Sequence, residues 1–166
     1  MTSRIAILVA TALVPLAAAA PSAPTRAESS NAQRQVYENG IVRVKSAYPF
    51  AETVERLKGD VGSKGITFFF AVEQARLAAE AGISLRPSTL LVFGNPALGS
   101  QFMTSNPVAG IDWPVRLVVI EDEKGDVWAI YNDFHYLARR HGITDRNGAF
   151  DKAADVIGSI TSAVTM

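Results

Sequence analysis

The chain has 166 residues, no cysteine, and 16 basic against 16 acidic side chains. Without cysteine, the protein has no disulfide, no thiolate nucleophile and no cysteine-ligated metal. The longest basic run is Arg139–Arg140, which argues against nucleic-acid binding because that function needs a clustered positive surface.

The first 27 residues have the order of a secretory signal peptide. Arg4 supplies a positive charge, an apolar run follows over 5–16, and small residues come next, so cleavage is expected after Ala19 or Ala27. The apolar run is shorter than the roughly 20 residues of a spanning helix, and a retained anchor is the alternative. We expect an exported protein, periplasmic or extracellular, with no stable membrane span once the signal is removed.

Residues 28–35 continue a stretch rich in Ser, Pro and Ala, and we expect them to form a flexible lead. Residues 36–166 have the size of one domain, which is enough to build a hydrophobic core without disulfides. Loss of Arg4 and Arg26 with the signal leaves 14 basic residues against 16 acidic ones.

Hydrophobic periodicity predicts an α+β domain. Strands are expected at 41–47, 66–74, 88–94, 114–122 and 126–133. Helices are expected at 49–65, 74–82, 133–142 and 147–164, with one or two helical turns over 96–106. Asn39–Gly40 is typical of a hairpin turn. Short links between consecutive strands favour a mainly antiparallel sheet of about five strands with helices packed on it.

The predicted strands are apolar on both sides. Phe68 and Phe70 are expected on one face and Phe69 on the other, and the strands at 88–94 and 114–122 are equally apolar throughout. Leaving several such side chains in water forgoes about 1.5–3 kcal/mol each. The long helices can cover one face, so we expect a partner, the shorter helices or a ligand on the second face, and we favour a homodimer.

Gly94–Asn95–Pro96 follows a predicted strand, but it has no Gly-Lys-Ser/Thr and no dinucleotide fingerprint. Gly94 permits a positive φ, Asn95 is pushed into an extended conformation by the following proline, and Pro96 suits the first turn of a helix. The stretch is therefore interpreted as a chain turn that can also wall a pocket.

Six residues near the ends of strands form a candidate ligand pocket. They are Asn95, Asp112, Trp113, Tyr131, Asn132 and His141. Antiparallel pairing brings several of these strand ends together. A buried Asp112 can act as a general acid or base, whereas in a turn it accepts backbone hydrogen bonds. Trp113 either lines a ligand site or belongs to the core.

The two histidines lie six residues apart on one predicted helix. That spacing rotates His141 by about 240° from His135, which excludes a two-histidine metal clamp within the helix. His141 is either a surface or capping histidine or a single axial ligand to haem or a metal, with Tyr131, Tyr136 and Met103 as possible companions. No metal site and no cofactor is assigned.

Three functions stay open. The favoured one is a non-catalytic module that binds a small ligand or a partner and acts as a homodimer. The second is an enzyme of unassigned type that uses Asp112 and His141, and the third is a haem- or metal-binding protein. No serine lies in a G-x-S-x-G elbow, so a serine triad is not expected.

A series of short motifs follows in a fixed order over residues 41–141. They are Gly82 with Leu85-Arg86-Pro87, Phe93-Gly94-Asn95-Pro96 with Gly99, Asp112 and Pro114 flanking Trp113, Glu121-Asp122, Gly125 with Val127-Trp128, Tyr131-Asn132, and Leu137-Ala138 with Arg140-His141. This set resembles the uncharacterised family catalogued as domain of unknown function 302. The resemblance implies a β-α-β4-α fold like one half-repeat of the TATA-binding protein and a tendency to dimerise, and it implies no activity.

The chain departs from the family pattern after the second predicted strand. Relatives often carry an acidic residue and a histidine where this chain has Glu73–Gln74. An amide does not titrate near neutral pH and is a poor metal ligand, so a role of that histidine does not transfer to Gln74.

Overall fold

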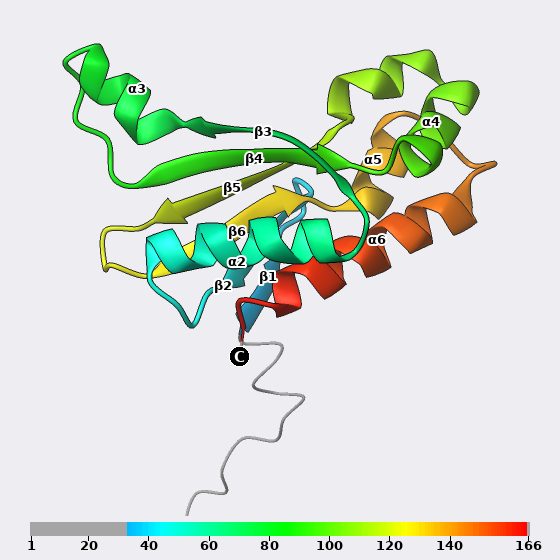
Figure 1. Ribbon diagram of the computed structural model, residues 1–166. Coiled ribbons are helices and arrows are strands. Elements are labelled where there is room, and N and C mark those ends of the chain that lie inside the picture. The colour runs from blue at the N-terminus through cyan, green and yellow to red at the C-terminus, as the bar shows by residue number, and fades with distance from the viewer. Residues whose placement is uncertain (1–32, 166) are drawn as a thin grey trace, which may run out of the picture.

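A computed structural model of the chain describes residues 33–165, so the expected signal peptide lies outside the described residues (Figure 1). The strands are β1 (Arg34–Val36), β2 (Ile41–Lys45), β3 (Thr67–Glu73), β4 (Ser88–Gly94), β5 (Val115–Glu121) and β6 (Val127–Asn132). They form one sheet in the order β1-β2-β6-β5-β4-β3, and every neighbouring pair is antiparallel. The predicted α+β fold with an antiparallel sheet is confirmed.

The described sheet has six strands rather than about five, because β1 was not predicted. β1 pairs with β2 across the predicted turn at Asn39–Gly40, where the Gly40 amide donates to the Tyr37 carbonyl at 2.9 Å. All three residues of β1 are exposed. The strand therefore lacks the apolar alternation by which a half-buried strand is recognised in a sequence.

The helices are α2 (Phe50–Ser63), α3 (Gln74–Glu80), α4 (Pro96–Ser105), α5 (Phe134–Arg140) and α6 (Asn147–Ser162), with a 3-10 helix η1 (Pro107–Asp112) after α4. The two longest, α2 and α6, cover one face of the sheet, whereas α3 has no buried residue and adds nothing to the core. Helices α2 and α6 lie along the sheet (Figure 1). Their buried residues, such as Leu57 and Ile157, form one core with Leu91 and Leu117 of the sheet. The order from β2 onward is β-α-β4-α, with α6 as the last helix and α3, α4, η1 and α5 as additions, as the family resemblance implies.

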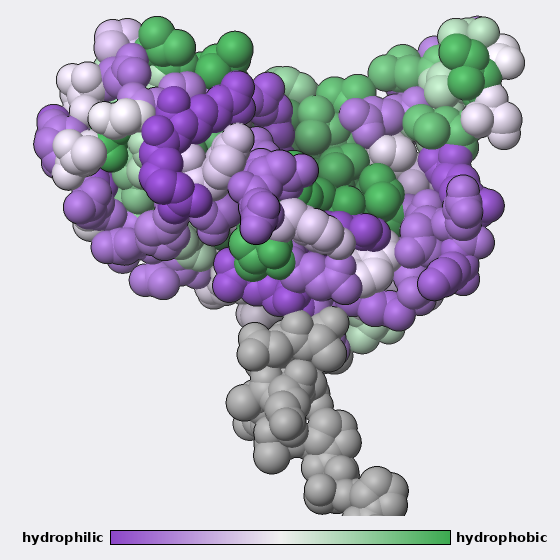
Figure 2. Space-filling model, turned by 180° about the vertical axis from the view of Figure 1, so that it is seen from behind, coloured by the Kyte–Doolittle hydropathy of each residue, from purple (hydrophilic) through white to green (hydrophobic). Residues whose placement is uncertain are grey.

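The opposite face of the sheet is apolar at its centre. The register places Leu90, Val118 and Ile130 side by side on β4, β5 and β6, and all three are half-buried. We call these three residues the open-face patch. Seen from behind, the molecule shows hydrophobic surface in a hollow between two lobes (Figure 2). The sheet therefore has two apolar faces, as predicted. Helices α2 and α6 cover one of them, and the open-face patch lies on the opposite one.

The alternation predicted for the phenylalanines of β3 is wrong. Phe68 lies opposite Phe93 and Phe70 lies opposite Val92, so the register shifts between them and Phe69 is an extra, bulged residue. Phe68 therefore packs against the core, whereas Phe70 is on the open face and is 54% exposed. A bulge moves every later side chain to the other face.

Candidate functional site

The turn after β4 starts the lobe that carries the candidate site. Asn95 is extended and caps α4, since its side-chain oxygen accepts a hydrogen bond from the Leu98 amide at 3.1 Å, and Pro96 begins the helix. Gly94 does not take a positive φ. Its missing side chain instead allows a close approach, because a Cβ there would lie 3.2 Å from the indole Nε1 of Trp113.

Trp113 is fixed between α4 and the bulge of β3. A Cβ on Gly99 would lie 1.8 Å from the Trp113 Nε1, so the indole occupies space that only glycine leaves free. The Phe69 ring meets the indole edge-to-face at a centroid distance of 6.1 Å. The half-buried indole thus becomes a rigid wall beside α4.

A cavity of about 710 Å³ lies between α4, α6 and the ends of β4 and β5, and we call it the α4–α6 groove. Its apolar walls include Phe93, Leu98, Phe102, Trp113, Val156 and Ile157. Phe93, Phe102 and Ile157 are buried members of the main core. The groove therefore reaches from the surface into the hydrophobic interior.

Polar groups line the same groove only where it meets solvent. They are Lys64, Asn95, Gln101, Lys152, Asp155 and Ser159, and all six residues are exposed. Apart from the exposed Ala97, the apolar lining residues beneath them are buried or half-buried. The groove therefore has an apolar, buried floor and a polar, solvent-exposed mouth, which is the usual form of a small-molecule site.

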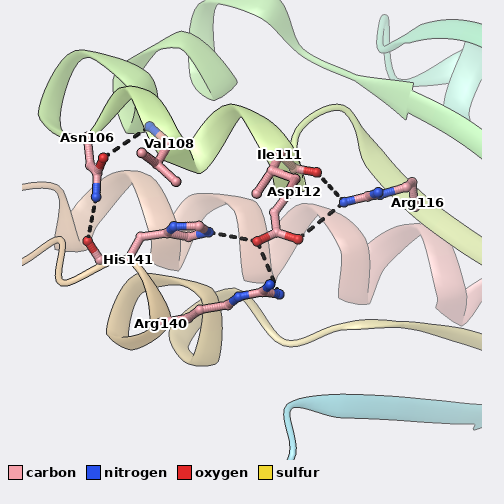
Figure 3. Close-up of polar contacts among 7 residues, drawn as sticks. All are labelled: Asn106, Val108, Ile111, Asp112, Arg116, Arg140 and His141. Carbon is pink, nitrogen blue, oxygen red and sulfur yellow. Dashed lines mark hydrogen bonds and ion pairs between the residues drawn. The ribbon is translucent and has the colours of Figure 1, made fainter.

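Asp112 and His141 meet in a second, separate cluster (Figure 3). The His141 Nε2 lies 2.7 Å from the Asp112 Oδ2, and each side chain is only 7% exposed. Arg116 donates to the Asp112 Oδ1 at 3.2 Å, and Arg140 lies 3.4 Å from Oδ2. Asn106 adds a link, because its side-chain amide donates to the His141 carbonyl at 2.9 Å.

This cluster leaves little room for a reactant. The void beside Asp112, Trp113 and His141 measures about 10 Å³, close to the volume that a single water needs. Both carboxylate oxygens of Asp112 already have partners. The cluster therefore joins the end of η1 and the start of β5 to the C-terminal end of α5, and it does not form an open cleft.

The six predicted pocket residues are not brought into one pocket. Asn95 and Trp113 line the α4–α6 groove, whereas Asp112 and His141 bind each other. Tyr131 is 3% exposed in the core, and burial raises the pKa of its phenol. Asn132 lies opposite Ile41 in the sheet.

The other candidate ligands lie apart from this cluster. His135 pairs with Asp151 at 2.9 Å on the surface, Tyr136 packs over Gly40, and Met103 packs on Gly110. Within residues 33–165, no group of three or more His, Asp or Glu side chains is arranged to hold a metal ion.

Residues 42–165 match the family described as Domain of unknown function DUF302. The chain belongs to this family. A solved structure of an uncharacterized conserved DUF302 protein from Bacillus stearothermophilus has a similar fold, with a TM-score of 0.69 and 17% identity over 75% of this chain and 98% of that one. The resemblance seen in the sequence motifs is confirmed.

Two curated relatives are named "Fluoride-specific ion channel FluC 1", from Brucella suis biovar 1 (strain 1330) and Brucella abortus biovar 1 (strain 9-941). Each is 38% identical over 108 residues, which is 65% of this chain but only 42% and 40% of those proteins. The chain thus spans about two fifths of the length of these relatives. Among residues 33–165, no helix has the length and apolar character to cross a membrane.

Sequence reasoning missed the part of the groove that α6 contributes to this DUF302 domain. Phe150, Ile157 and Ile160 form the apolar stripe of α6, which read as ordinary core. Beside that stripe, Lys152, Val156 and Ser159 follow at i, i+4 and i+7 and line the groove. This mixed polar and apolar row was the available signal, but its partner surface on α4 lies about 50 residues earlier and cannot be placed by periodicity.

Proposed function

We propose that this DUF302 protein is an exported, non-catalytic module that binds a small molecule in the α4–α6 groove and acts as a homodimer. The observation that carries the proposal is the groove itself, with a volume of about 710 Å³, a buried apolar floor and an exposed polar mouth. Small-molecule sites commonly measure about 300–1,000 Å³ and combine apolar walls with a few polar groups.

The Asp112–His141 cluster supports a binding role over the enzyme alternative. A general acid or base must reach a proton of the substrate directly or through one water. The Asp112 carboxylate is hydrogen-bonded to His141 and Arg116, and the void beside Asp112 and His141 measures only about 10 Å³. Those contacts favour a structural role, in which the cluster holds the wall that carries Trp113.

The open-face patch supports the homodimer. Leu90, Val118 and Ile130 are aligned across three strands and are half-buried. Apolar patches on a protein surface mark interaction sites. A two-fold pairing would bury the same patch on both copies at once, which is the common way in which identical chains associate.

Export rests on the N-terminal sequence. The order of charge, apolar run and small residues before Ala27 matches a cleavable signal. The family match begins at residue 42, after this stretch. The channel activity named for the two Brucella relatives does not transfer to this chain, because the shared 108 residues cover less than half of each of those proteins.

Native mass spectrometry of protein purified from its own host tests all three parts. The expected spectrum shows a dimer that begins after Ala19 or Ala27 and retains a small molecule. Val156→Trp, which fills the groove, should lose the molecule and remain dimeric. A ligand-free monomer at micromolar concentration, with an unprocessed N-terminus, would contradict the proposal.

A further inference from the structure

We infer that the ligand of the α4–α6 groove is a single-chain amphiphile with a carboxylate head, its hydrocarbon chain on the groove floor and its head between Lys64 and Lys152. This inference rests on the proposed binding function and adds the chemical class of the ligand.

The shape of the groove indicates an elongated chain. Helix α6 lines it from Lys152 to Ile160, and a rise of 1.5 Å per residue makes this wall about 12 Å long. Phe93, Leu98 and Phe102 form the facing apolar wall. Each methylene buried on such a surface contributes about 0.8 kcal/mol, so a linear chain along the helix gains from its whole length.

The mouth of the groove favours a head group that accepts hydrogen bonds and carries negative charge. Two ammonium groups, Lys64 and Lys152, stand there against one carboxylate, Asp155. Lys64 is paired with Asp60 outside the lining. Lys152 forms no ion pair within the part of the chain that the structure describes, so its three N–H donors are available to a ligand.

Among possible head groups, a carboxylate forms the strongest hydrogen bonds with the Lys152 N–H donors. It accepts charge-assisted hydrogen bonds from Lys152, whereas an alcohol makes weaker neutral ones. A quaternary ammonium head accepts no hydrogen bond from Lys152 and would lie beside the like charge of that ammonium group. The expected order of affinity is therefore carboxylate, alcohol, quaternary ammonium, with differences of about fivefold that shrink at high salt because the lysines are exposed.

Calorimetric titration with decanoate, 1-decanol and decyltrimethylammonium tests this order, since the three probes share one chain and differ in the head. The full chain should bind decanoate most tightly. Lys152→Gln should remove the advantage of decanoate over decanol and leave decanol binding unchanged. Lys58→Gln, at a half-buried position of α2 outside the groove, is the matched control and should change none of the three.

The outcomes separate the head group from the groove. Equal binding of all three heads, or a preference for the ammonium probe, overturns the inference and leaves the proposed groove in place. If none of the three binds to folded wild-type protein, the inference fails, whereas the proposed function fails only if the native mass spectrum also shows no retained small molecule. Val156→Trp should abolish all three affinities while keeping a cooperative thermal transition; unchanged binding in that variant also contradicts the groove as the site.

Discussion

The imidazole Nε2 of His141 lies 2.7 Å from the Asp112 carboxylate, although the two residues are 29 positions apart in the chain. Asp112 ends η1, and His141 caps the C-terminal end of α5. Trp113, the next residue after Asp112, lines the groove. The cluster thus fixes the chain segment on which one wall of the groove depends.

Asp112→Ala is expected to destabilise the protein strongly. Removal of the carboxylate leaves His141 buried without its partner and leaves Arg116 and Arg140 uncompensated, and breaking a buried pair costs about 3–5 kcal/mol. The matched control is Asp151→Ala, which removes the partner of His135 at an exposed position and should cost less than about 1 kcal/mol. Urea unfolding measures both, and equal losses would contradict a structural role for the buried pair.

Gly99→Ala is expected to displace Trp113. The new Cβ would lie 1.8 Å from the indole, and overpacking of this kind costs about 1–3 kcal/mol. Gly158→Ala in α6 meets no atom within 4 Å and should instead stabilise by about 0.5–1 kcal/mol. Thermal unfolding and Trp113 emission, read in a Trp128→Phe background, check the pair. An unshifted Trp113 spectrum in the Gly99 variant would show that the contact is not rigid.

Asp122 is expected to make stability depend on acid pH. A hydrogen bond from the Trp128 indole at 2.9 Å holds the pKa of Asp122 below its usual value of 3.8, with the Lys124 and Asp126 amides assisting. A depressed folded pKa gives a stabilisation that is present above the unfolded pKa and is lost as the pH falls through the folded one.

The comparison of wild type with Asp122→Asn tests this dependence. The difference in unfolding free energy should be largest at about pH 7 and should shrink toward about pH 2.5. Asp155→Asn, whose carboxylate lies at the groove mouth, serves as the control for a general charge effect. A wild-type advantage over Asp122→Asn that stays constant across this range would rule out the Trp128 bond as its source.

Val118→Lys is expected to convert a dimer into a monomer. Val118 lies between Leu90 and Ile130 on the open-face patch, so a two-fold interface would bring two new ammonium groups together in an apolar contact. Thr104→Lys on the exposed side of α4 adds the same charge elsewhere. Sedimentation velocity at micromolar concentration should show a dimer for wild type and the Thr104 variant. A wild-type monomer would refute the interface.

The sequence predicted the individual helices, strands and turns better than the irregularities within them and the contacts between them. The apolar repeat of α6 and the Asn39–Gly40 turn are local signals, and both elements form as expected. The bulge at Phe69 was missed because no glycine or proline marks it. Asp112 and His141 were predicted as members of one ligand pocket, and the two side chains do meet, but no local signal revealed that they hydrogen-bond each other.

The groove was only partly predictable for a related reason. Asn95 and Trp113 stood out as residues beside strand ends. Phe102 and Val156 looked like ordinary core residues, because a sequence does not reveal that α4 and α6 leave space between them. Cavities depend on the distance between elements remote in sequence, which residue periodicity does not encode.

The groove as the binding site is tested most directly by site-specific labelling, which is clean because the chain has no cysteine of its own. Val156→Cys places a thiol in the groove, and Thr104→Cys places one on α4 outside the lining. A saturating amount of the decyl probe that binds best should slow alkylation of Cys at 156 by tenfold or more, about the effect of 90% occupancy, and leave the rate at 104 unchanged. Equal alkylation rates at 156 with and without the probe would contradict binding in the α4–α6 groove.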